Sequence, residues 1–269
     1  METLRKPWTR GFIFPGIRMI ALLSLLCGCI VQADEDADEN RRKLSLYFEG
    51  EDIYQQSCLP CHGPRGKGDG PWAEGWTKNR PRNFRSGIFK FRTTPMGFLP
   101  TDEDLKRTIT NGISGTAMPM FRGNLNEGNL EAVIVYLKSF SREWKKKERR
   151  AEPVALSEKP DWMDDSTQRK EHAELGKALF ATYCAACHGA EGKGNGAGAV
   201  GLIDQWQFAI EPADLSAEHY KSGDRAEDLF RTISTGLDGT PMVGFMGVLD
   251  DSKRWDLVAY IRHLQTIAK

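Results

Sequence analysis

Two pentapeptides place two thiols beside an imidazole: Cys58-Leu59-Pro60-Cys61-His62 and Cys184-Ala185-Ala186-Cys187-His188. This C-x-x-C-H pattern is the attachment signal for c-type haem. The two thiols add to the vinyl groups of haem as thioethers, and the adjacent histidine reaches the iron as an axial ligand. We therefore expect two covalently bound haem c groups. Their attachment residues are Cys58, Cys61, Cys184 and Cys187, and their proximal iron ligands are His62 and His188.

Cysteine pairs at this spacing also occur in zinc sites and in thiol redox proteins. A zinc ribbon would draw both pairs into one site, but here the pairs lie 126 residues apart and each is followed directly by histidine. A thioredoxin-type pair would need a βαβ pattern, which surrounds neither motif. Haem is the preferred interpretation, with structural zinc or a disulfide as the alternatives.

The sequence repeats itself around these motifs. Gly50, Tyr54 and Cys58 match Gly176, Phe180 and Cys184 at a constant offset of 126 residues. Further on, the stretch from 104 to 118 matches that from 228 to 242 at an offset of 124, which places insertions or deletions in the loops. We divide the chain into a first repeat (residues 44–140), a charged linker (141–165) and a second repeat (166–269), each treated as a domain.

Each repeat is predicted to contain three helices. Apolar spacing and capping residues, such as Thr101 before three acidic residues, place them at 44–58, 101–111 and 125–140, and at 167–184, 224–235 and 252–267. Many of the 27 glycines lie between each haem motif and its downstream methionine. The prediction is an all-α fold whose irregular loops wrap around a cofactor.

The sixth iron ligand of the first haem cannot be a second histidine from the same repeat, because His62 is the only histidine in residues 44–140. The thioethers available there are Met96, Met118 and Met120. We expect Met118, because Gly115-Thr116-Ala117-Met118 recurs as Gly239-Thr240-Pro241-Met242. In the second repeat Met242 is expected, with Met246, His219 and His263 as competitors. Ligation by methionine and histidine raises the reduction potential and leaves no open position on the iron, which favours electron transfer over catalysis.

The order of helix, C-x-x-C-H, glycine-rich loop, helix, methionine loop and helix resembles class I cytochrome c. The tandem arrangement is similar to dihaem c-type cytochromes of bacterial respiratory chains. The resemblance implies two small helical domains, each wrapped around one covalent haem. It also implies that Gly50 with Tyr54, and Gly176 with Phe180, pack against last-helix aromatics, and that a backbone carbonyl braces each proximal histidine. The last-helix aromatics are Tyr136 and Tyr260.

The first repeat also contains an arginine-rich loop with Arg80, Arg82 and Arg85. Arginines can hold the haem propionates through charge-assisted hydrogen bonds. The same side chains can dock an acidic redox partner or simply keep the loop soluble. Three tryptophans, Trp72, Trp76 and Trp206, are expected to pack the haem cavities.

The N-terminus (residues 1–28) has the pattern of an export signal. Basic residues precede an apolar run, residues 19–31, which is too short for an ordinary membrane-spanning helix. Two processing sites compete: a lipobox that would lipidate Cys29, and cleavage after Ala33. Residues 29–43 are expected to be an acidic flexible leader. The formal net charge of zero offers no overall basic field for nucleic acid.

These observations predict an exported, periplasmic dihaem cytochrome, anchored to a membrane if Cys29 is lipidated. It would transfer single electrons between redox protein partners, either alone or as a subunit of a respiratory oxidoreductase. The alternative is a dihaem enzyme, a peroxidase or a sulfur-compound dehydrogenase, in which one haem can lose its distal ligand.

Overall fold

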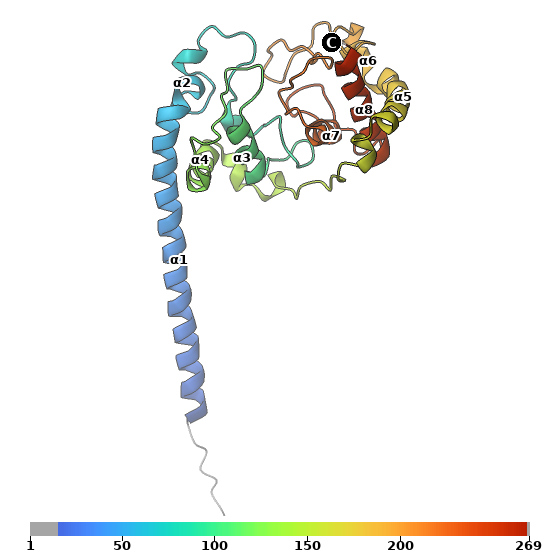
Figure 1. The fold of residues 1–269 in the computed structure, drawn as a ribbon. Helices are drawn as coiled ribbons and strands as arrows, with labels where there is room; N and C mark the ends of the chain where they lie inside the picture. Colours follow the sequence, from blue (N-terminus) through green and yellow to red (C-terminus); the bar gives the residue numbers. More distant parts are fainter. Residues whose placement is uncertain (1–15, 268–269) are drawn as a thin grey trace, which may run out of the picture. The chain divides into compact units, whose positions relative to one another are not determined.

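The computed structural model describes the backbone of residues 16–267 and the side chains of residues 35–267. Residues 1–15 of the expected signal, and the side chain of Cys29, lie outside this part. Contacts divide the chain into two compact parts, residues 1–45 and residues 46–269, and each is described by itself. Figure 1 shows the helices of both.

Helix α1 (Gly16–Ser57) begins in the first part and ends in the second. Residues 29–43, expected to be flexible, are helical. Ion pairs one turn apart, Asp38 with Arg41 and Glu39 with Lys43, support the exposed helix here. Among the residues that the structure describes, no helix combines the length and apolarity needed to cross a membrane.

Residues 46–269 contain the second repeat and all but the first two residues of the first. Between residues 16 and 267 all regular structure other than two isolated bridges is helical. The first repeat consists of the end of α1, α2 (Leu59–His62), α3 (Asp102–Asn111) and α4 (Glu127–Ser139), with 3₁₀ turns at Pro71–Ala73 and Phe84–Ser86. The second consists of α5 (Ser166–Tyr183), α6 (Ala185–His188), α7 (Ala226–Thr235) and α8 (Asp251–Ile267), with a 3₁₀ turn at Ala197–Ala199. The predicted all-α fold is confirmed.

The second long helix of each repeat begins at a cap. Thr101 Oγ1 accepts from the Asp104 amide, and the Asp104 carboxylate accepts from the Thr101 amide, which is a reciprocal capping box. In α7 the Asp228 carboxylate accepts from the Arg225 amide at 3.3 Å, and Arg225 offers no comparable side-chain oxygen. Both helices end at a glycine with positive φ, Gly112 and Gly236.

In both repeats the first and last helices cross at a glycine. A Cβ added to Gly50 would lie 2.0 Å from the Ala132 carbonyl oxygen, and one added to Gly176 would lie 2.0 Å from that of Asp256. One turn further on, Tyr54 packs against Tyr136 and Phe180 packs against Tyr260, with ring centroids 5.3 and 5.1 Å apart. The crossing joins two helices remote in sequence and sets where the haem motif begins.

The linker between the repeats does not run free through solvent. It contains 3₁₀ turns at Arg142–Lys145, Lys147–Arg149 and Asp161–Met163. The Leu99 amide donates to Arg149 O, the Val154 amide donates to Thr93 O, and Trp255 Nε1 donates to Ser157 Oγ. The linker is therefore fastened to the first repeat and then to the second.

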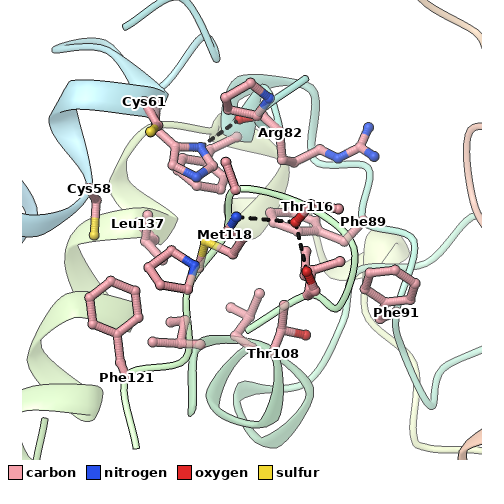
Figure 2. A pocket seen from close by; sticks show the side chains of 18 of the residues that line it. Cys58, Cys61, Arg82, Phe89, Phe91, Thr108, Thr116, Met118, Phe121 and Leu137 are labelled. Carbon is pink, nitrogen blue, oxygen red and sulfur yellow. Dashed lines mark hydrogen bonds between the residues drawn. The ribbon is translucent and has the colours of Figure 1, made fainter. Parts of the chain in front are cut away.

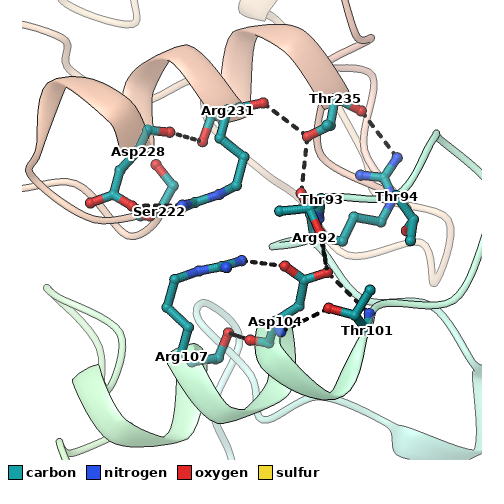
Figure 3. Close-up of polar contacts among 12 residues, drawn as sticks. Arg92, Thr93, Thr94, Thr101, Asp104, Arg107, Ser222, Asp228, Arg231 and Thr235 are labelled. Carbon is teal, nitrogen blue, oxygen red and sulfur yellow. Dashed lines mark hydrogen bonds and ion pairs between the residues drawn. The ribbon is translucent and has the colours of Figure 1, made fainter. Parts of the chain in front are cut away.

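The repeats also contact each other where Arg92, in the loop before α3, meets the C-terminus of α7. Figure 3 shows this contact beside α3 and α7, which face each other. Arg92 is 1% exposed and donates to the carbonyls of Thr235 and Gly236 at 3.0 and 3.2 Å. Its guanidinium also lies 3.4 Å from the Asp238 carboxylate. A cation at the C-terminus of α7 is favoured by the helix dipole. The first repeat thereby supports the segment that leads into the second methionine loop.

Candidate functional site

The first C-x-x-C-H motif lies on a turn that continues directly from α1. The Cys58 amide donates to Tyr54 O, and the His62 amide donates to Cys58 O. Pro60 is tolerated in this first turn because its missing N–H would have no helical partner. Cys58, Cys61 and His62 all line one pocket, shown in Figure 2. The other walls are largely apolar and come from α3, α4 and the loops: Phe84, Phe89, Leu105, Ile109, Phe121, Val133 and Leu137.

His62 is held in one orientation and one protonation state. Its Nδ1 lies 3.2 Å from Arg82 O, and its ring stacks on Phe84 with centroids 4.4 Å apart. Burial lowers the pKa of His62 to about 4, so the ring is neutral at pH 7. Because a carbonyl can only accept, Nδ1 carries the proton and Nε2 keeps the lone pair that a metal needs.

Met118 reaches the same pocket from a loop that follows α3. Gly112 has a φ of 65°, and a Cβ there would lie 2.6 Å from the carbonyl carbon of Pro119, so only glycine lets the loop fold back. The Ile113 amide donates to Met118 O at 3.1 Å, and the Met118 amide donates to Thr116 Oγ1 at 3.1 Å. Figure 2 shows Met118 in the pocket, held by the Thr116 bond.

The other methionines of the first repeat lie elsewhere. Met96 and Met120 are 40% and 66% exposed, and the pocket lining includes neither. Of the three thioethers that the sequence offered for the first site, the structure brings only Met118 into the pocket with His62.

The second motif repeats this backbone geometry. His188 Nδ1 lies 3.0 Å from Ala213 O, and burial lowers the pKa of His188 as well. The Leu237 amide donates to Met242 O at 2.9 Å, and the Met242 amide donates to Thr240 Oγ1 at 3.2 Å. The methionine loops therefore share their hydrogen bonds one for one.

The competitors in the second repeat are engaged or exposed. His219 pairs with Asp224 at 2.7 Å, His263 lies beside the Tyr260 ring, and Met246 is 40% exposed. His172, which precedes the motif, pairs with Asp256 at 2.6 Å and stacks on Trp162. Met242 is partly buried in a loop of the same form as that of Met118.

The three arginines of the arginine-rich loop do not all reach the pocket. Arg80 and Arg82 line it, whereas Arg85 is exposed and lies outside the lining. The lining contains two further cations: Lys90, which follows the arginines in the same basic stretch but was not assigned to the site, and Lys221, which the sequence reasoning missed. Each lysine follows an aromatic residue in the loop after its haem motif, Phe89-Lys90 and Tyr220-Lys221, but this pattern does not place Lys221 at the first pocket.

The expected roles of the tryptophans hold only in part. Trp76 lines the first pocket, as expected. Trp206 belongs to the second repeat and lies under the Arg82 guanidinium, 4.3 Å from it. Trp72 is 70% exposed and does not line that pocket, because it lies in a 3₁₀ turn whose buried residue is Ala73.

The residues present suit a covalent haem. Two thiols one turn apart, a neutral imidazole and a thioether share one pocket with predominantly apolar walls. Burial raises the pKa of the Cys58 thiol to about 12, so no charge is placed against those walls. This is the donor chemistry by which c-type haem is held.

Comparisons with known proteins assign both repeats. Residues 173–265 match the family Cytochrome c, and residues 47–137 match Cytochrome C oxidase, cbb3-type, subunit III. A chain of the Kuenenia stuttgartiensis reducing HAO-like protein complex is similar in structure, with a TM-score of 0.73 and 36% identity, covering 80% of this chain and 95% of that one.

Curated relatives include two subunits of cbb3-type cytochrome c oxidases. The CcoP subunit of Azospirillum brasilense is 27% identical over 86% of this chain, and the FixP subunit of Azorhizobium caulinodans is 28% identical over 60%. A thiosulfate dehydrogenase of Psychrobacter arcticus is 24% identical over 78%. The matched regions span 66%, 45% and 56% of these relatives' lengths. With both repeats matched, the chain belongs to the cytochrome c family and carries two cytochrome c domains in tandem, which implies two covalent haem c groups.

Proposed function

We propose that this dihaem cytochrome c relays single electrons between redox proteins, with His62 and Met118 as the axial ligands of one haem and His188 and Met242 as those of the other. The observation that carries the proposal is the duplicated ligand support. In both repeats a backbone carbonyl fixes the histidine tautomer, and a loop closed by its own hydrogen bonds presents a methionine.

The haem, when bound, supplies a one-electron iron couple. The chain's own residues decide how that couple is used. The Nδ1 bonds leave Nε2 of each histidine available to ligate the iron, and each methionine loop would supply the second protein ligand. The apolar walls around His62 exclude water, and thioether ligation favours the reduced state. A site closed in this way suits electron passage and leaves no position for a substrate.

Partners follow from the relatives. The related proteins named above include subunits of redox complexes. We infer that this chain likewise exchanges electrons within or beside a larger oxidoreductase. The similarity to a thiosulfate dehydrogenase supports the second candidate, an enzyme in which one haem releases its methionine. Of the two histidines His188 is the less buried, which makes the second haem the candidate for that role.

Export is part of the proposal, because haem c is attached outside the cytoplasm in this family. We propose a signal over residues 1–28, followed by lipidation of Cys29 or cleavage after Ala33, and cytochrome domains over residues 44–140 and 166–269. Mass spectrometry of the mature N-terminus distinguishes the two processing routes. A chain that keeps residues 1–28 would contradict both.

The test of the axial ligands is the spectrum of the oxidised holoprotein. We expect a methionine–iron charge-transfer band with contributions from two haems. Met118→Ala and Met242→Ala should each remove about half of it, and Met120→Ala, at an exposed position two residues from Met118, should remove none. High-spin iron in the unaltered protein, or rapid turnover of peroxide or thiosulfate, would replace the relay by the enzyme.

A further inference from the structure

Four cations line the first haem pocket, and three of them are coupled, because Arg82 and Lys221 both act electrostatically on Lys90. Arg82 and Lys90 come from the first repeat and Lys221 from the second, and all three line the pocket. Lys221 is fixed across the boundary, because its Nζ donates to Asn79 Oδ1 at 2.6 Å. Arg82 crosses the boundary in the other direction, with its guanidinium over the Trp206 ring. We call Arg82, Lys90 and Lys221 the shared cation cluster.

Protein carboxylates do not neutralise this cluster. Within residues 35–267 none of its three members forms an ion pair. The acidic group that acts on both Arg82 and Lys90 is Asp204, but its Oδ1 already accepts from the amides of Trp206 and Phe208 at 2.9 and 3.0 Å. Glu211 acts on Lys221, but its carboxylate already pairs with Lys78 at 2.6 Å. Among the described residues the cluster therefore has nearby carboxylates but no ion-pair partner of its own, beside a pocket with largely apolar walls.

Holding like charges together has a cost. The pKa of Lys90 falls to about 8, first through burial and then through Arg82 and Lys221, and Asp204 opposes the fall only in part. Partly buried cations are stable when an anion neutralises them. A surplus at the mouth of a haem pocket therefore indicates an anion that arrives with the ligand.

The corresponding loop of the second repeat has no such cluster. The two loops can be aligned by their hydrogen bonds, because Arg82 O and Ala213 O each brace a haem-motif histidine. In this register Arg80, Arg82 and Arg85 correspond to Glu211, Ala213 and Ser216. Of the two cluster members on the first-repeat loop, only Lys90 has a basic counterpart, and that counterpart is Lys221 itself.

We propose that the shared cation cluster binds the carboxylates of the first haem, so that the second repeat supplies part of the first haem's binding site through Lys221. This rests on the proposed function only in taking the pocket as a haem site. Reduction adds one negative charge to the haem, so nearby cations favour the reduced form. Lys221 thereby makes the potential of the first haem depend on the second repeat.

The test is a redox titration of the holoprotein carrying Arg82→Gln, Lys221→Gln or both. We expect each single variant to lower the midpoint of the same one-electron wave. The oxidised-to-reduced ratio at a fixed potential should change about tenfold, which is about 59 mV for one electron. The double variant should shift that one wave further and leave the other wave in place. Lys221→Arg keeps the charge and should keep the wild-type midpoint. Lys170→Gln removes a charge from an exposed site of the second repeat outside the pocket lining and should change neither wave.

Three results would overturn the proposal. Lys221→Gln could shift the wave that Arg82→Gln leaves unchanged, which would assign Lys221 to the other haem. Lys221→Arg could shift the wave as much as Lys221→Gln, which would show a packing effect. Both glutamine variants could keep their midpoints and only slow electron exchange with an acidic partner protein, which would make the cluster a docking site. None of these bears on whether two haems are ligated by methionine, which the oxidised spectrum reports separately.

Discussion

The two haem-binding loops have the same backbone and different side chains. In each, a carbonyl accepts from the haem-motif histidine, and an amide two residues later donates to a glycine carbonyl: Phe84 to Gly66 and Leu215 to Gly192. Around the first histidine lie an aromatic ring and arginines. Around the second lie an aliphatic side chain, an alanine and Glu211, which pairs with Lys78 of the first repeat at 2.6 Å.

This contrast separates two tasks. Backbone hydrogen bonds and glycines fix where the ligands stand, and these are duplicated. Side chains decide how each site responds to charge and water, and these have diverged. In the proposed electron relay, two haems would therefore be held by the same backbone support in different electrostatic surroundings.

The largest expected effect is on stability, and it comes from the helix crossing that both repeats share. Gly50→Ala and Gly176→Ala each place a Cβ 2.0 Å from a carbonyl oxygen of the last helix, so the helices must separate. We expect each to lower the free energy of unfolding by about 3 kcal/mol, the upper end for overpacking. Denaturant unfolding of the holoprotein measures the loss.

Gly247→Ala is the matched control, because a Cβ there meets nothing within 4 Å and the residue has no positive φ. It should change the free energy of unfolding by less than about 0.5 kcal/mol. If Gly50→Ala were costly and Gly176→Ala were not, the two repeats would not share a support and the comparison would fail.

The next prediction transfers the positive charge of the first haem-binding loop to the second. Ala213→Arg places a guanidinium at the position that Arg82 occupies in the first repeat. We expect the second haem's midpoint to rise by about 59 mV, a tenfold change in the oxidised-to-reduced ratio. Ala213→Gln adds a side chain without charge and should leave the midpoint unchanged. Equal shifts in the two variants would attribute the effect to shape.

A smaller effect is expected from the aromatic ring that stacks on His62. Phe84→Leu gives the first site the residue of the second, Leu215, and removes a stack with centroids 4.4 Å apart and planes 17° from parallel. The loss should be about 1 kcal/mol in the free energy of unfolding. Leu215→Phe is the reverse exchange and should not destabilise by more than this. A loss much larger than 1 kcal/mol in Phe84→Leu would mean that the ring also holds the loop.

Most of the backbone features that position the iron ligands could be predicted from the sequence, because each depends on a short local pattern. The C-x-x-C-H motifs, the Thr101 cap and the glycines before each methionine are short patterns with one structural outcome. The helix bounds came out within about two residues except for α1, which begins at Gly16 and not near residue 44. The acidic run of residues 34–39 suggested a solvated leader. In the structure this run is part of α1, where ion pairs one turn apart offset the repulsion between the acidic side chains.

The divergent part was not predictable in the same way. Lys221 belongs to the first haem pocket only because the repeats pack against each other, and no spacing in the sequence encodes that contact. The Arg82 carbonyl was expected only as an unspecified backbone group, since bracing of the histidine uses the main chain. Arg85 was counted with Arg80 and Arg82 because it is their neighbour in sequence, yet its side chain lies outside the pocket lining.

The smallest effect concerns a pH dependence that only the second repeat should show. His219 pairs with Asp224, and the first repeat has Ile88 at the aligned position. The hydrogen bond and charge of Asp224 raise the pKa of His219 above its ordinary value. The pair therefore stabilises the fold fully below pH about 6.5 and loses that contribution as pH rises through the raised pKa. Because the pair is exposed, the effect is small. The difference in free energy of unfolding between the protein and His219→Gln should be present near pH 5.5 and vanish by about pH 8. A difference that grew with pH would mean that His219 acts as a neutral hydrogen-bonding group, and the two loops would then differ in packing and not in charge at this position.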